Sequence, residues 1–212
     1  MMHLAVTEEL IKRYGPGGAD RLRFGTVLPD AVTDRREYSL SHFRIKTGGG
    51  GRAYDLTAFR NRFGDLMKTD GLYLGYYLHL IQDLVYRHFV YDEYRWDPVP
   101  EGNVERLHGD YRQANAYVIR RYGLTADIRV PDAFENEPLN GVAAFDIPAL
   151  IRELKRDTEP AEPRERFFFT DSMADEYIRR AAEQCGRELD ALKNGADSVN
   201  KRSETYEYFA GL

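Results

Sequence analysis

The feature that most constrains the fold is a ten-residue run at 74–83, Leu-Gly-Tyr-Tyr-Leu-His-Leu-Ile-Gln-Asp. The run is almost continuously apolar and aromatic and contains no proline, which predicts a helix buried on most sides. His79 and Asp83 are four residues apart, so a helix places them on one face. Burying the Asp83 carboxylate among leucines and tyrosines is costly unless a cation neutralises it. The pair therefore predicts a divalent metal held by an imidazole nitrogen and a carboxylate oxygen.

Hydrophobic spacing and capping residues elsewhere predict a chain built almost entirely of helices. Helices are expected at 3–14, 55–68, from 70 or 71 to about 91, 103–122, 146–157 and 170–193. The stretch between the first two helices is predicted to be a loop region that ends in a flexible glycine run at Gly48–Gly51. Loops are also expected at 129–141 and 158–163. Because alternating strand patterns are scarce, we expect an all-α fold, with residues 1–212 forming a single domain.

Composition excludes several classes of protein. The 212 residues carry a formal net charge of -5, and no basic patch dominates. Binding of nucleic acid through overall electrostatic attraction is therefore not expected. Cys185 is the only cysteine, which excludes an internal disulfide. The amino terminus does not resemble a signal peptide, and no apolar run is long enough to cross a bilayer. We therefore expect a cytoplasmic protein without a transmembrane segment.

Three further residues can complete a metal site with His79 and Asp83. His3 begins the first predicted helix, Asp30 follows a proline in a loop, and His42 lies between a serine and a phenylalanine before the glycine run. Together the five residues offer three imidazoles and two carboxylates. Such a set suits zinc, with iron or manganese as alternatives.

Each of these residues also has an ordinary explanation when taken singly. His3 would be a surface residue near a terminus, and Asp30 would be a turn or cap aspartate. His79 would be a neutral buried histidine bonded to its own i+4 carboxylate.

The other two histidines are expected to lie outside the site. His88 and Asp92 repeat the four-residue spacing, but nine residues of helix place His88 on the far side from His79. A partly exposed pair near the helix end is the favoured interpretation. His108 has an arginine, Arg112, at its i+4 position, so a structural role is favoured there as well.

The order of these pieces resembles the bacterial zinc-dependent phospholipase C family. The shared pieces are a histidine heading the first helix, Pro-Asp-Ala-Val at 29–32, Ser-His-Phe at 41–43 and the run at 74–83. The resemblance extends to intracellular hydrolase-like members and, more distantly, to fungal zinc-dependent single-strand nucleases. It covers roughly residues 1–125, with a looser helical match over 142–194.

The resemblance implies an all-α fold with a zinc cluster among its helices. Carried over by motif, Asp30, His42, His79 and Asp83 would bind one metal, and His3 would help to bind a second that Asp83 bridges. Asp30 and Asp83 would thus belong to the catalytic centre. The nucleophile would be a water or hydroxide whose pKa the metals lower.

Two departures from the family pattern limit what carries over. Secreted members use the mature amino-terminal amino group as a ligand, whereas two methionines precede His3 here. They also bind a further zinc through a later His-x-x-x-Glu or His-x-x-x-Asp pair, which His108 cannot form. One or two metal ions are therefore expected.

The sequence thus favours a metal-dependent phosphoesterase acting on a small phosphorylated substrate or a phospholipid headgroup. The alternative is a catalytically inactive metal-binding or protein-interaction member of the same fold. A third hypothesis, an HD-type phosphohydrolase, is disfavoured because the chain contains no adjacent His-Asp pair.

Overall fold

The computed structural model describes residues 1–15, 18–46, 52–161, 164–195 and 205–206. Its α-helices are α1 (Met2–Tyr14), α2 (Ala19–Val27), α3 (Arg35–Ser41), α4 (Leu56–Met67), α5 (Gly71–Arg87), α6 (Asn103–Tyr122), α7 (Ile147–Asp157) and α8 (Asp171–Lys193). Short helical turns are η1 (Leu28–Asp30), the π-helix η3 (His88–Glu93), η4 (Phe134–Asn136) and η5 (Pro138–Gly141). The strands are β1 (Arg44–Lys46), β2 (Arg52–Tyr54) and β3 (Thr205–Tyr206). The expected all-α class is confirmed.

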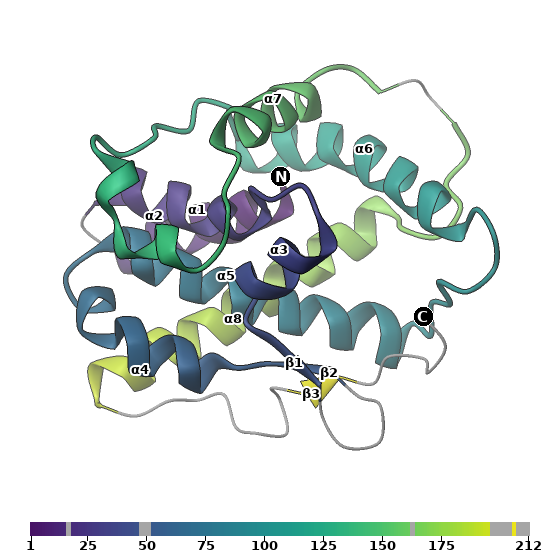
Figure 1. Cartoon of the computed structure of the whole chain (residues 1–212). Helices are drawn as coiled ribbons and strands as arrows, with labels where there is room; N and C mark the ends of the chain where they lie inside the picture. Colours follow the sequence, from purple (N-terminus) through teal and green to yellow (C-terminus); the bar gives the residue numbers. More distant parts are fainter. Residues whose placement is uncertain (16–17, 47–51, 162–163, 196–204, 207–212) are drawn as a thin grey trace.

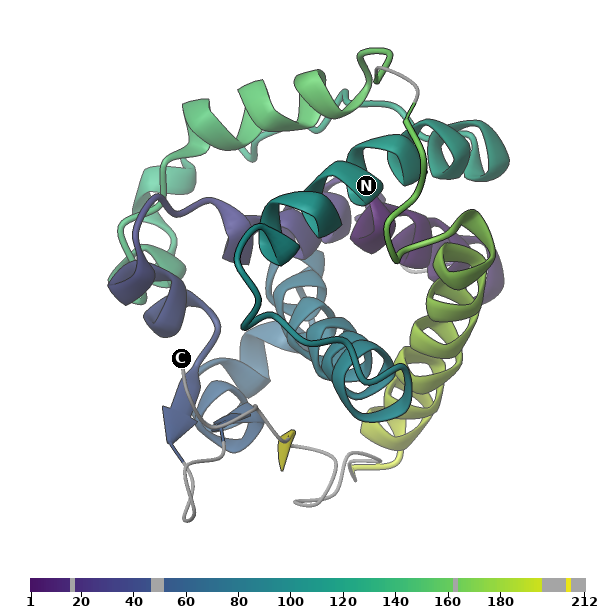
Figure 2. The same cartoon turned by 90° about the vertical axis from the view of Figure 1, so that its right-hand side faces the viewer.

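Helix α5 is the centre of the fold. It packs against α2, α4 and α8, and Figure 2 shows it nearly end-on with other helices around it (Figures 1 and 2). All of its residues from Tyr76 to Leu84 are buried, as the apolar run predicts. Because α5 carries His79 and Asp83, the most enclosed helix is also the one that presents two charged or polar groups to the interior.

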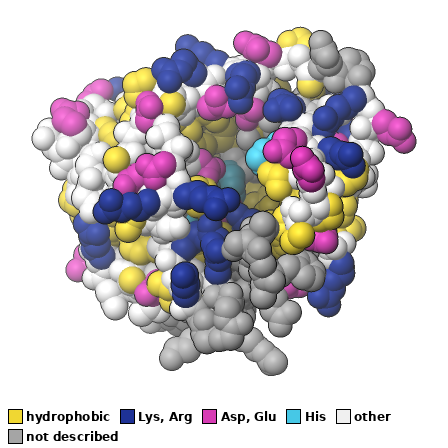
Figure 3. Space-filling view, turned by 45° about the vertical axis from the view of Figure 1, so that its right-hand side comes forward, with side chains coloured by type: hydrophobic (Ala, Val, Ile, Leu, Met, Phe, Trp, Pro, Cys, Tyr) yellow, Lys and Arg dark blue, Asp and Glu magenta, His cyan; other side chains and the backbone are white. Residues whose placement is uncertain are grey.

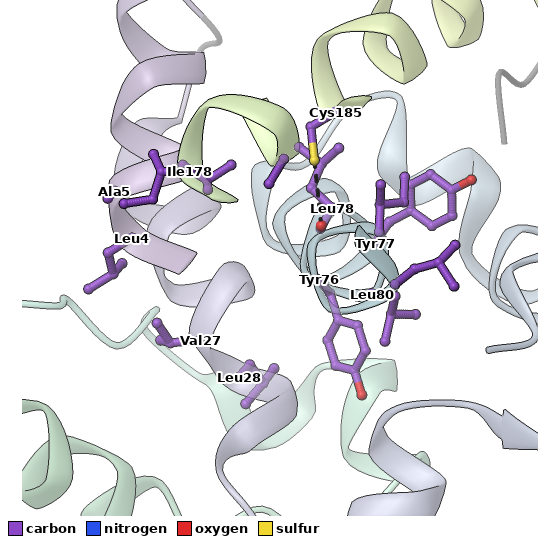
Figure 4. Packing of buried hydrophobic residues seen from close by; sticks show 14 of the residues in the cluster. Leu4, Ala5, Val27, Leu28, Tyr76, Tyr77, Leu78, Leu80, Ile178 and Cys185 are labelled. Carbon is purple, nitrogen blue, oxygen red and sulfur yellow. Dashed lines mark hydrogen bonds between the residues drawn. The ribbon is translucent and has the colours of Figure 1, made fainter. Parts of the chain in front are cut away.

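Apolar side chains leave α5 in several directions and fill the core. Figure 4 shows Tyr76 and Tyr77 pointing to different sides of the helix, while Leu78 faces Cys185 on α8. The Cys185 thiol donates to the Leu78 carbonyl at 3.8 Å, and burial raises the pKa of this thiol above its usual range. The side chain is fully buried and acts as a small core residue.

Capping residues set the predicted starts of four helices. Asp55 accepts the Ala58 amide at the start of α4, and Thr170 accepts the Met173 amide at the start of α8. Asp70 and Asp146 act in the same way at α5 and α7. The far end of the central helix differs from the prediction, since α5 ends at Arg87 and continues as the π-helix η3.

The prediction of a loop region between the first two predicted helices is wrong in two places. Residues 19–27 form α2 and residues 35–41 form α3. Helix α2 contains Gly25 and has little apolar periodicity, so its stability depends on packing against α5. This packing cannot be predicted from the residues of α2 alone. Helix α3 is only seven residues long, although Asp34 caps it through the amides of Arg36 and Glu37. The predicted glycine run at 48–51 and the end of the predicted loop at 158–163 lie outside the described residues.

A small antiparallel sheet lies at the edge of the helices (Figure 1). In its register Arg44 faces Tyr54 and Lys46 faces Arg52, and β2 also pairs with β3. These strands are two or three residues long, which is too short for an alternation of apolar and polar residues to be visible in the sequence. Their consequence for the site is that β2 delivers the buried Tyr54 side chain to the centre of the molecule.

Helices α2 and α5 touch through two glycines. A Cβ added at Gly25 would lie 2.1 Å from the Leu72 carbonyl oxygen, and one at Gly75 would lie 2.2 Å from the Leu22 carbonyl oxygen. Glycine is therefore required on both sides of the crossing for the two backbones to come this close. The crossing fixes α2 against the helix that carries His79 and Asp83.

The segment before α8 is attached to α6 by one buried carboxylate. Asp110 accepts the backbone amides of Phe167, Phe168 and Phe169 at 3.0, 2.7 and 2.9 Å. The Asp110 side chain is fully buried, so these three amides depend on it rather than on water.

Replacing Asp110 by alanine should lower the free energy of unfolding by about 3–5 kcal/mol, because three buried amides lose a charged acceptor. Urea denaturation followed by circular dichroism measures the change. The matched control is Asp132→Ala, whose side chain is 91% exposed, and it should leave stability nearly unchanged. Equal stability of the two variants would contradict this role for Asp110.

Candidate metal centre

The structure brings together all five residues that the sequence singled out. His3 lies in the first turn of α1, Asp30 ends the turn η1, and His42 follows the last residue of α3. His79 and Asp83 project from neighbouring turns of α5. Their donor atoms form two groups suited to a metal ion, His3–His79–Asp83 and Asp30–His42–His79. The members come from four separate elements, so only the tertiary fold assembles them.

Two of the imidazoles are held in a fixed tautomer. His79 Nδ1 lies 2.8 Å from the Thr26 carbonyl oxygen, and His42 Nδ1 lies 3.0 Å from the Tyr38 carbonyl oxygen. A carbonyl oxygen only accepts, so each Nδ1 carries the hydrogen and donates it. In the neutral ring, each Nε2 therefore presents a bare lone pair to the cluster. Backbone carbonyls orient metal-ligating histidines in the same way.

The two bare nitrogens face each other. His42 Nε2 lies 3.1 Å from His79 Nε2, and both side chains are fully buried. Two lone pairs at this separation repel unless a cation lies between them. Burial, with help from His3, lowers the pKa of His79 to about 4, so the His79 imidazole is neutral at neutral pH. The two nitrogens are therefore arranged as a metal ion bound to both would need them.

Two carboxylates complete a four-donor set around this point. Asp30 Oδ1 lies 3.4 Å from His42 Nε2 and 3.9 Å from His79 Nε2, and Asp83 Oδ2 lies 3.6 Å from His42 Nε2. Tetrahedral ligands bound ~2.0–2.1 Å from a zinc ion lie roughly 3.3 Å from one another. Three of these donors, on Asp30, His42 and His79, lie within 4.8 Å of one another, and Asp83 Oδ2 is the fourth, close to His42.

The second group is less complete. His3 Nδ1 donates to the side-chain oxygen of Gln82 at 3.0 Å, which turns His3 Nε2 toward Asp83 Oδ1 at 3.5 Å. Asp83 thus offers one oxygen to each group, and His79 is shared between them. A second ion here would gain two ligands of its own at most, His3 and Asp83 Oδ1.

Both carboxylates are held ionised. Burial raises the pKa of Asp83, but the imidazoles of His79, His42 and His3 outweigh it and lower the pKa overall. The same balance, desolvation against His79 and His42, holds the pKa of Asp30 well below its usual range. The site therefore presents two negative charges to a cation. Asp30 differs in access, since its side chain is 45% exposed while Asp83 is 10% exposed.

Two side chains of the site reach solvent, since His3 is 21% exposed and Asp30 is 45% exposed. Figure 3 shows a hollow in the surface with histidine and acidic side chains inside it and Lys and Arg side chains around it.

Sequence reasoning missed the residues that hold the ligands. Tyr38 and Tyr54 both donate to Asp83 Oδ2, Gln82 holds His3, and Arg87 lies behind the two phenols. Arg87 was detectable, because it lies four residues after Asp83 on the same helix. The two tyrosines gave no comparable signal, since their contacts bridge 45 and 29 residues of chain.

The remaining histidines lie outside both groups of described residues. His88 Nδ1 bonds directly to Asp92, and the two side chains are 35% and 29% exposed, as expected for a structural pair. The His108 ring packs against Tyr111, with the ring centres 6.1 Å apart.

Comparisons with protein-family models, curated proteins and solved structures found no match for this chain. Among the described residues, no helix combines the length and apolar character needed to cross a membrane.

Proposed function

We propose that the protein is a metal-dependent phosphoesterase that binds zinc, one ion among Asp30, His42, His79 and Asp83 and a second, weaker ion beside His3. The observation that carries the proposal is the pair of buried lone pairs 3.1 Å apart on His42 and His79. They are flanked by two ionised carboxylates. Three nitrogens and carboxylate oxygens suit zinc, and iron or manganese are the alternatives.

Two features favour a catalytic role over a purely structural one. Structural zinc sites are closed by four protein ligands, whereas catalytic sites bind three and keep a position for water or substrate. Three donors, on Asp30, His42 and His79, lie within 4.8 Å of one another here. The Asp30 side chain is also 45% exposed, so this ligand reaches solvent. A bound divalent metal would supply Lewis acidity and lower the pKa of water.

The charges around the site favour an anionic substrate. Lys and Arg side chains flank the hollow in Figure 3, and Arg87 lies behind Asp83. In this arrangement Asp83 is the fixed carboxylate. Asp30 would bind the metal through Oδ1 and, because its side chain reaches solvent, would accept a proton from an attacking water on its other oxygen. A phosphate diester or monoester meets these requirements, with a phospholipid headgroup as one form of it. The resemblance of the ordered ligand set to zinc-dependent phospholipase C points to the same chemistry.

Removal and return of metal tests this function. Protein depleted with a chelator should lose hydrolysis of p-nitrophenyl phosphate and bis-p-nitrophenyl phosphate, and added zinc should restore it. Iron(II) and manganese(II) are tested in parallel. His42→Ala should not be restored, because it removes one of the facing nitrogens. A zinc-loaded wild-type protein that turns over neither ester nor a phospholipid would contradict the proposal and favour the inactive metal-binding or interaction protein.

A further inference from the structure

Arg87 lies beside the metal centre with each of its three nitrogens directed at a tyrosine hydroxyl. Nε lies 3.4 Å from Tyr54, one terminal nitrogen lies 3.4 Å from Tyr38, and the other lies 3.1 Å from Tyr91. The three tyrosines come from β2, α3 and the π-helix η3. One guanidinium therefore connects three elements next to Asp83.

The charge on Arg87 fixes the direction of the phenol hydrogens. A guanidinium only donates, so a phenol oxygen that it contacts must accept and must aim its own hydrogen elsewhere. For Tyr54 the hydrogen goes to Asp83 Oδ2 at 3.0 Å, and for Tyr38 it goes to the same oxygen at 3.5 Å. Hydrogen bonds in such a chain strengthen one another in a buried setting.

We infer that Arg87 is a positioning residue for the metal centre: through the hydroxyls of Tyr54 and Tyr38 it fixes the Asp83 carboxylate. The fixed carboxylate turns Oδ2 toward the four-donor set and leaves Oδ1 for His3. This inference rests on the metal site of the proposed function. It adds that the site is tuned by a cation and two phenols that do not themselves bind the metal.

Arginine is better suited to this task than lysine. Its planar fork presents donors in fixed directions, whereas an ammonium is a compact charge on a flexible stem. The position also follows from the helix, because Arg87 lies one turn after Asp83 and Tyr91 lies one turn after Arg87. Arg87 is the last residue of α5, and the π-helix η3 that begins at His88 carries Tyr91.

Cobalt(II) binding to the full-length, metal-depleted protein tests the inference without measuring turnover. The dissociation constant comes from competition with a chromogenic chelator, and the visible absorption of cobalt reports its coordination. Tyr54→Phe, which removes only the hydroxyl, should weaken binding about 10- to 100-fold and alter the absorption bands, because loss of a group that orients a ligand has effects of this size. Arg87→Lys should act in the same direction, since it keeps the charge and loses the fork.

Tyr91→Phe is the matched control, because it removes a phenol from Arg87 and leaves both phenols on Asp83. It should bind cobalt with wild-type affinity and spectrum. Tyr38→Phe, at the longer contact, is a second variant of the same kind and should show a smaller effect of the same sign. Far-UV circular dichroism and thermal unfolding of the metal-free proteins establish that each variant folds.

Wild-type affinity and spectrum in either Tyr54→Phe or Arg87→Lys would overturn the inference, and so would a wild-type protein that binds no cobalt. A wild-type protein that binds cobalt but hydrolyses no phosphate ester contradicts the proposed function alone.

Discussion

Asparagine in place of Asp30 should weaken zinc binding by more than about 100-fold, because groups that only orient a ligand already account for about 10- to 100-fold. The change keeps the shape of the side chain and removes its negative charge from a point 3.4 Å from His42 Nε2 and 3.9 Å from His79 Nε2. Asp30 is half-exposed, so the core is not disturbed. Competition titration against a chelator of known zinc affinity gives the measurement.

Asp65→Asn is the control for the loss of one negative charge. The Asp65 side chain is 97% exposed and pairs with Lys68 on the surface of α4. Its zinc affinity should equal that of the wild type. If Asp30→Asn also bound zinc as tightly as the wild type, Asp30 would not be a ligand, and the four-donor set would be wrong.

The second large effect is expected from Gly75→Ala. The added Cβ would lie 2.2 Å from the Leu22 carbonyl oxygen and 2.9 Å from the Thr26 amide nitrogen. Backbone atoms cannot move aside as a flexible side chain can, so α2 and α5 must separate. We expect the free energy of unfolding to fall by more than about 3 kcal/mol, beyond the usual cost of overpacking. Urea denaturation measures this loss.

The same variant should also weaken metal binding. The Thr26 carbonyl lies on α2 and accepts from His79 Nδ1 at 2.8 Å, so separating α2 from α5 releases the histidine. Gly64→Ala is the matched control, since nothing lies within 4 Å of an added Cβ at that helical position. It should be neutral or slightly stabilising. Equal stability of Gly75→Ala and the wild type would contradict the close helix crossing.

Much of the fold could be predicted because the information is local. The apolar run at 74–83 marks α5, and Asp55, Asp70 and Thr170 mark the starts of three helices through their own backbone contacts. Helix α2 could not be predicted in this way, since its stability comes from a crossing over Gly25 and Gly75. The strands were too short for their alternation to be visible.

The candidate ligands could be found from residue type and order, but the residues that hold and orient them could not. His79 and Asp83 share a helix face, so their spacing shows that they are neighbours. The tautomer of His79 depends instead on a carbonyl 53 residues away in the chain, and the orientation of Asp83 depends on Tyr54, 29 residues away. Contacts of this kind arise only when the helices pack, and they decide which atoms of the cluster face one another.

The most direct test of the metal centre is a crystal structure of protein purified without added metal, with anomalous diffraction recorded on both sides of the zinc absorption edge. We predict a zinc peak ~2.0–2.2 Å from His42 Nε2, His79 Nε2, Asp30 Oδ1 and Asp83 Oδ2. An absence of bound metal at this point after soaking with zinc, with the two histidine nitrogens still facing each other, would contradict the account.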